Sequence, residues 1–386
     1  MNFAETLADL NEWHFFQEFV YSKNTFQPTP KVQVELADSV LWLGELLCVF
    51  QLKEREAGPE TTASTERKWF KKKVLDQATR QIRDTLRYLD ENNSIALKNH
   101  RGHKLQLEFK KISQLHKLVV YLPNKQFPQD SLNPKYHTSK TAGLIHIITA
   151  HDYLGIVRTL LTPAEVMDYL DFREEMIELW KERVNDVPEP ALIGQYLHGD
   201  STTPPSQCHI EQLRTLDQCA DEWDMSGIIS KFTDRVTTEN TSTDYYPIVT
   251  ELASLKRNEL REFKARFQLS IDKSRSDEIT RPYRIAVPRT DCGFVFIPLT
   301  KELFQHRRTA LLNMTLAHKY EQRVSKCIGV AIGNHDQGWF HAEWCYVNSP
   351  WQPDEHMDKL LTENNPFRAV KAAELPRYKF KPTDGG

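Results

Sequence analysis

Residues 36–55, LADSVLWLGELLCVFQLKER, place two apolar runs around a Gly44–Glu45 dipeptide. A glycine in the first position of a two-residue loop between such runs is typical of a hairpin with a type II′ turn. A turn centred there pairs positions whose numbers add to 89, so Asp38 lies opposite Gln51. Lys53 points to the same face as Gln51, because side chains alternate along a strand. The sequence therefore predicts that three polar side chains meet at the open end of one hairpin face.

Near its turn this hairpin is apolar on both faces. One face carries Val40, Trp42, Leu47 and Val49, and the other carries Leu41, Leu43, Leu46, Cys48, Phe50 and Leu52. Strands of this kind are covered on both sides, as in sheets with helices packed against each face. The hairpin is therefore expected at the centre of an α/β domain.

The flanking segments supply helices and further strands. Helices are predicted over 3–22, 66–91 and 162–184, strands over 104–111 and 116–123, and a strand followed by a helix over 143–161. Further along, a charged helix near 254–268 and strands over 283–289, 292–299, 326–334 and 339–347 indicate a second sheet.

The length of 386 residues favours two domains. The NDVPEP segment at 185–190 is the expected boundary. We predict an α/β domain over 1–185, with a central mixed sheet flanked by helices, and an α+β domain over 186–386 for recognition, regulation or oligomerisation. The formal charge of -3 means that a nucleic-acid partner would need a local basic patch.

The order of helix, hairpin with Asp38 and Gln51-x-Lys53, basic helix, strand and strand–helix resembles the PD-(D/E)XK nuclease superfamily. This superfamily includes many restriction and repair endonucleases. Its members place an aspartate on one core strand and an acidic-x-Lys triplet on the next. Gln51 in place of the acid resembles the QXK variant of the Mrr-like branch, and Glu18 matches an acid that members often carry on the first helix. The resemblance covers roughly residues 1–180.

The resemblance implies a restriction-endonuclease-like fold and an endonuclease that hydrolyses DNA with Mg²⁺ or Mn²⁺. Asp38, Glu18 and Gln51 would be metal ligands, and Lys53 would orient the attacking water or stabilise the charge on phosphorus. Independently of the family, phosphodiester hydrolysis needs a hard cation, and Mg²⁺ takes oxygen ligands. The family analogy also suggests a role in restriction or phage defence.

The second helix is the expected nucleic-acid contact. Residues 66–104 contain eleven Lys or Arg and five Asp or Glu, a local excess of six positive charges that suits a phosphate backbone. The residues that we assign to this contact are Lys71, Lys72, Lys73, Gln77, Arg80, Gln81 and Arg83.

Other interpretations remain open. Gln51 also fits a catalytically inactive protein that only binds nucleic acid. A third interpretation is a scaffold within a larger assembly, formed with a partner subunit or as a homo-oligomer. Asp38 and Lys53 could form the solvated end of an edge hairpin, Glu18 could pair with a Lys or Arg, and the basic helix could be a solvated face. NHDQG at 334–338, with His341 and Glu343 after it, offers metal-ligand types but is more typical of a turn.

The expected location is the cytoplasm. The start, MNFAETLADLNEW, lacks a basic segment followed by an apolar stretch, and no apolar run is long enough to cross a bilayer. No membrane partner is therefore expected.

Overall fold

The fold was analysed in a computed structural model. It describes residues 3–369 apart from 30–31, 57–61, 126, 129–133, 215, 217–221, 224, 226–231, 233–235, 239–240 and 335–338, together with 372–374, 376 and 377. The chain divides into two compact units. The first comprises 1–218, 226–236 and 376–386, and the second comprises 219–225 and 237–375.

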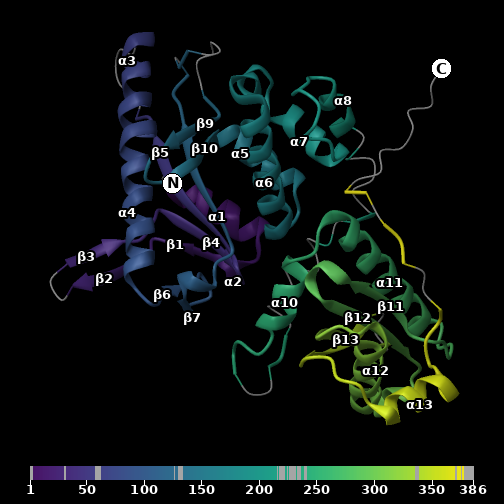
Figure 1. Ribbon diagram of the computed structural model, residues 1–386. Helices are drawn as coiled ribbons and strands as arrows, with labels where there is room; N and C mark the ends of the chain where they lie inside the picture. Colours follow the sequence, from purple (N-terminus) through teal and green to yellow (C-terminus); the bar gives the residue numbers. More distant parts are fainter. Residues whose placement is uncertain are drawn as a thin grey trace, which may run out of the picture. The chain divides into compact units, whose positions relative to one another are not determined.

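A six-stranded mixed sheet is the centre of the first unit (Figure 1). Its order is β1 (Val20–Ser22), β4 (Ser39–Leu43), β5 (Leu46–Glu54), β8 (Gln114–Leu122), β10 (Gly143–Thr149) and β9 (Tyr136–Ser139). β1, β4 and β5 are antiparallel neighbours, β5, β8 and β10 are parallel, and β9 is antiparallel to β10. Two small hairpins accompany it: β2 (Thr25–Thr29) with β3 (Val32–Glu35), and β6 (Ile95–Lys98) with β7 (Lys104–Leu107).

Helices cover both faces of this sheet, as the two-sided apolar hairpin predicts. One face is covered by a long helix made of α3 (Ala63–Trp69), a π-helical segment (Phe70–Gln77) and α4 (Ala78–Glu91). On the other face, α5 (Ala150–Thr159) packs the ring of Tyr153 on that of Phe50 at 5.6 Å. Among the described residues, the other helices of this unit are α1 (Phe3–His14), α2 (Phe16–Phe19), α6 (Pro163–Trp180), α7 (Glu189–His198) and α8 (His209–Arg214), with 3-10 turns at Phe109–Lys111 and Lys181–Asp186.

The predicted hairpin register is confirmed. Ser39 pairs with Phe50 and Val40 with Val49, so the paired numbers add to 89. Gly44 has φ 58, the conformation that the first position of a type II′ turn requires and that glycine adopts without strain.

The predicted helix over 3–22 is wrong in its second half. The helix ends at His14, and the short α2 begins at Phe16, whose φ of 52 interrupts the helical conformation. Residues 20–22 are strand β1, because they pair with β4 at the sheet edge. Tertiary pairing thus overrides the helical spacing of the apolar residues.

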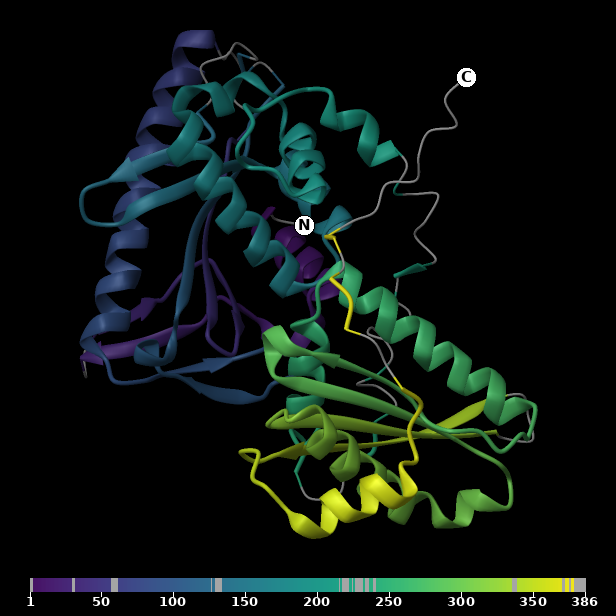
Figure 2. The same ribbon diagram turned by 45° about the vertical axis from the view of Figure 1, so that its right-hand side comes forward.

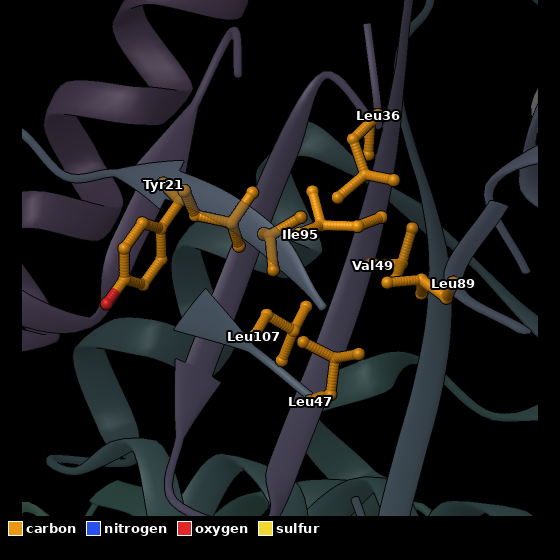
Figure 3. Close-up of a cluster of buried hydrophobic side chains, with 10 residues drawn as sticks. Tyr21, Leu36, Leu47, Val49, Leu89, Ile95 and Leu107 are labelled. Carbon is orange, nitrogen blue, oxygen red and sulfur yellow. The ribbon is translucent and has the colours of Figure 1, made fainter. Parts of the chain in front are cut away.

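A hydrophobic cluster on one sheet face joins the hairpin to its surroundings (Figure 3). Leu47 and Val49 of β5 meet Leu89 of α4, together with Ile95 and Leu107 of the β6–β7 hairpin. Val49 and Leu47 are fully buried. The small β6–β7 hairpin is therefore fixed to the sheet by apolar packing.

The second unit has a four-stranded sheet in the order β11 (Tyr283–Val287), β12 (Cys292–Leu299), β13 (Lys326–Asn334) and β14 (Phe340–Asn348) (Figure 2). These strands match the four predicted ones. Its helices are α10 (Tyr246–Ala253), α11 (Arg257–Arg275), α12 (Arg307–Gln322) and α13 (Glu355–Asn364), with 3-10 turns at Pro288–Thr290 and Leu303–His306. Phe263 of α11 stacks edge-on against Phe294 and Phe296, whereas α12 packs on the face of Val295.

The division of the chain differs from the expected boundary at 185. Residues 186–218 belong to the first unit. Glu189 at the start of α7 is buried and forms an ion pair with Arg173 of α6, with Nε 2.8 Å from the carboxylate. The polar segment with its two prolines is thus a turn inside the first unit. The helix after it stays in this unit because the buried charge of Glu189 needs its partner on α6.

No helix in the described parts of the chain combines the length and the apolar character that crossing a bilayer requires.

Candidate active site

Asp38 lies directly before β4, at the open end of the hairpin. Its Oδ2 accepts a hydrogen bond of 2.6 Å from the backbone N–H of Leu52, and the ammonium of Lys53 lies 3.6 Å from the same oxygen. The Asp38 side chain is 24% exposed and that of Lys53 is 11% exposed. In the described part of the chain, Oδ1 of Asp38 has no hydrogen bond, so one carboxylate oxygen is available to a ligand.

Gln51 completes the predicted trio. Its side chain is buried, and its Oε1 lies 3.5 Å from Nζ of Lys53. The ammonium also donates to the carbonyl of Leu52 at 2.9 Å. The register predicted from the sequence thus brings Asp38, Gln51 and Lys53 together.

Two further charged residues act on this trio. Burial lowers the pKa of Lys53, and Lys73 of the long helix lowers it as well, although Asp38 and Glu35 partly offset this. Partial desolvation and the charge of Asp38 raise the pKa of Glu35. Glu35 ends β3, three residues before Asp38. The exposed carboxylate of Glu35 and the exposed ammonium of Lys73 therefore act on the charges of Asp38 and Lys53, and the structure shows no direct contact of either with the trio among the described residues.

Sequence reasoning did not select Glu35. The sequence patterns predict no element over 32–35, whereas the structure forms strand β3 there. Its short spacing from Asp38 was the available signal. Spacing alone does not give the direction of the side chain, because the chain bends between β3 and β4.

Glu18 is placed elsewhere. It lies before Val20 at one end of the β1–β4 ladder, and Asp38 lies at the other end, next to the Ser22–Ser39 pair. The buried carboxylate of Glu18 forms an ion pair with Arg101 at 2.9 Å. The structure thus does not bring Glu18 to Asp38. The alternative interpretation, that Glu18 pairs with a Lys or Arg, agrees with its contact to Arg101.

The basic helix passes the site. Its residues Lys71, Lys72, Lys73, Arg80 and Arg83 are exposed, and Gln77 and Gln81 are half-buried. The two glutamines lie between Lys73, which acts on Lys53, and Thr85, whose hydroxyl donates to the carbonyl of Leu36. In the described structure the buried Oε1 of Gln81 has no hydrogen-bond partner. The glutamines therefore lie on the stretch of helix that faces the site.

A second group of ligand types lies on the opposite sheet face. Ligand atoms of His116, His146 and Glu174 lie within 4.8 Å of one another. Arg173 donates to Nδ1 of His146 at 2.9 Å, so the proton of the neutral ring is on Nε2. Burial and Arg173 hold the pKa of His146 well below its usual range. A protonated nitrogen beside a buried guanidinium suits a hydrogen-bond network better than a cation site.

At the C-terminal cluster, β13 and β14 form an antiparallel hairpin that closes at the Asn334–Phe340 pair, as the turn interpretation predicts. Glu343 forms an ion pair with Arg307, and the ring of His341 lies 5.8 Å from that of Phe304. His335 and Asp336 lie outside the described residues.

No protein-family model matches the chain, and neither a curated protein nor a solved structure matches it.

Proposed function

We propose that the first unit is a metal-dependent endonuclease of restriction-endonuclease-like fold, which hydrolyses phosphodiester bonds in DNA. The observation that carries this proposal is the meeting of Asp38, Gln51 and Lys53 at the ends of β4 and β5. The order α1, β1–β4–β5, α3–α4 and β8 supports it, because the superfamily wraps its site as helix, three strands, helix and strand. The hairpins β2–β3 and β6–β7 would be insertions into that order.

The donor set fits a hard cation. Asp38 and Glu35 offer carboxylate oxygens and Gln51 an amide oxygen, and Mg²⁺ and Mn²⁺ prefer oxygen ligands. When bound, such an ion supplies charge neutralisation at the phosphate and a more acidic water. Asp38 would hold the cation through the free Oδ1. Glu35 would provide a second carboxylate in place of the acid that Gln51 replaces.

Lys53 would act on the phosphate. The partly buried ammonium lies against Asp38 Oδ2 and Gln51 Oε1 and donates to the carbonyl of Leu52. The N–H on the long contact with Gln51 would turn to the phosphate when the amide oxygen binds a cation. In hydrolysis, the water oxygen bonds to phosphorus and gives up a proton to solvent, while the bond to the leaving sugar oxygen breaks and that oxygen takes up a proton from solvent. Lys53 would donate to a non-bridging oxygen as negative charge accumulates there. Lys73 would neutralise the flanking phosphate.

The test is cleavage of supercoiled plasmid with Mg²⁺ or Mn²⁺ by the parent, by Asp38→Asn and Lys53→Met, and by the control Glu54→Gln. Glu54 is exposed at the end of β5, next to Lys53. We expect a loss of about a hundredfold or more in the first two variants and parental activity in the control. Equal cleavage by all four proteins would exclude this site. Circular dichroism checks that each variant is folded.

Gln51 favours a second candidate function, in which the same surface binds nucleic acid without cutting it. The amide carries no charge, so the trio holds a single carboxylate to attract a cation. This candidate predicts that oligonucleotide binding by the parent is unchanged by EDTA and that plasmid stays intact in both metals. Metal-dependent cleavage by the parent alone would contradict it.

A further inference from the structure

A cavity of about 590 Å³ opens beside the candidate active site. Its walls come from the connection of β1 to β2 and from the β6–β7 hairpin. Basic residues in the lining are Lys23, Lys98, His100 and Lys104. Among the described residues that line it, Glu12 alone is acidic, and it pairs with His100 at 3.0 Å. Lys23 pairs with Glu5 at 3.1 Å, so the excess of positive charge in the cavity rests on Lys98 and Lys104.

Two lysines that line this cavity lie on facing positions of one hairpin. Lys98 and Lys104 are directly opposite each other in the β6–β7 ladder. Both are exposed, and neither side chain has an acidic partner in the part of the chain that the structure describes. Like charges directly opposite in a ladder destabilise it. An anion between the two ammonium groups would remove this repulsion.

The position of these lysines is fixed by the fold. The side-chain amide of Asn24 donates to the carbonyl of Lys98 at 3.0 Å and accepts from its N–H at 2.6 Å. Ile95 and Leu97 are buried in the cluster of Figure 3, together with Leu107 on the partner strand. These backbone and apolar contacts thus hold the hairpin although the two facing lysines repel each other.

The cavity adjoins Asp38 through β1. The backbone N–H of Lys23 donates to the carbonyl of Asp38 at 3.4 Å, and the hydroxyl groups of Ser22 and Ser39 are 3.4 Å apart. Lys23 therefore links the cavity lining to the candidate catalytic aspartate.

We propose that this cavity binds a phosphate group between Lys98 and Lys104, on the nucleic-acid strand that also passes Asp38. The inference rests on the proposed function and adds a second anchoring point to the basic helix. The chemistry recognised is a phosphate, and its source is the polynucleotide backbone.

The first test is binding of a fluorescent single-stranded DNA oligonucleotide in EDTA over a series of salt concentrations. The pocket variant is Lys98→Gln/Lys104→Gln, and the control Lys110→Gln/Lys140→Gln removes the same charge from exposed positions outside the cavity. We expect the pocket variant to bind about tenfold more weakly, with a salt slope smaller by about 0.7, and the control to match the parent.

A second variant separates binding from folding. Lys104→Glu would turn the repulsive pair into an attractive one. We therefore expect a melting temperature equal to or above that of the parent, together with weaker oligonucleotide binding.

The outcomes also separate this inference from the proposed function. Parental affinity and salt slope in both pocket variants would overturn the cavity site and leave the nuclease proposal standing. A second arm measures melting with adenosine monophosphate. If the parent binds no oligonucleotide but is stabilised by the mononucleotide through Lys98 and Lys104, a free nucleotide is the source, and both the strand and the nuclease proposal fail. No response to either probe would overturn the phosphate site itself.

Discussion

Gln51 occupies the position where the proposed nuclease fold would carry an acid. Its amide oxygen lies 3.5 Å from the Lys53 ammonium, and the side chain is buried. An amide can supply a ligand oxygen but no negative charge. The affinity of the proposed site for a cation is therefore expected to depend on Asp38 and Glu35.

Gln51→Glu should raise the affinity for Mn²⁺ by about tenfold, because ligand charge sets the affinity of an oxygen site. Titration calorimetry measures this directly, without reference to cleavage. Gln106→Glu, at an exposed position of β7, is the control and should not change the affinity. Equal Mn²⁺ affinities in parent and Gln51→Glu would remove Gln51 from the ligand set.

Gly44 sets the register of the hairpin through its positive φ. An added Cβ would meet nothing within 4 Å, so the cost of Gly44→Ala comes from the backbone conformation alone. We expect a loss of about 1–2 kcal/mol in the free energy of unfolding, measured by urea denaturation.

Gly155→Ala is the matched control for this loss. The added Cβ again meets nothing within 4 Å, but Gly155 lies inside helix α5. Alanine should stabilise this helix by about 0.5–1 kcal/mol. A similar change of stability in both variants would contradict the role of the turn.

At the scale of elements, a buried ion pair joins α6 to α7. Glu189 accepts from Arg173 at 2.8 Å and from Tyr169 at 2.6 Å, and Lys135 lies 3.0 Å away. Burial would raise the pKa of Glu189, but Arg173 and Lys135 outweigh it and lower that pKa to about 2. Replacing the acid leaves the Arg173 charge buried without its partner.

Glu189→Gln should therefore lower the free energy of unfolding at pH 7 by about 3–5 kcal/mol. The folded pKa lies below the unfolded value near 4.5, so the stabilisation is present above pH 4.5 and is lost as the pH falls towards 2. The difference between parent and variant should shrink over that range in denaturation curves. Glu178→Gln, an exposed site on α6, serves as the control and should remain close to the parent at every pH.

At the scale of the whole molecule, each unit has its own hydrophobic core. Val49 is fully buried in the first unit and Val295 in the second. Compact units with separate cores often unfold in separate steps. Calorimetry should resolve two unfolding transitions. Val49→Ala should lower the free energy of unfolding of the first unit alone, and Val295→Ala that of the second unit alone, each by about 2 kcal/mol. A single transition shifted equally by both variants would contradict this independence.

The sequence determined much of the first unit because its signals are local. The turn glycine and the alternation of apolar residues gave the β4–β5 register, and the register gave the trio of Asp38, Gln51 and Lys53. The helix over 66–91 and the strand–helix at 143–161 were also predicted, because their apolar periods agree with their tertiary surroundings. The coarse architecture, an α/β unit followed by a unit with another sheet, follows from the same patterns.

Only the tertiary structure decided which other charged residues lie near the site and which lie away from it. The helix break at Phe16 precedes Glu18, which pairs with Arg101. The strand that ends at Glu35 carries an acid that no spacing rule had selected. The facing of Lys98 and Lys104 depends on a hairpin held by distant apolar residues. Periodicity specifies the face of one element, whereas the meeting of different elements depends on packing between segments far apart in the chain.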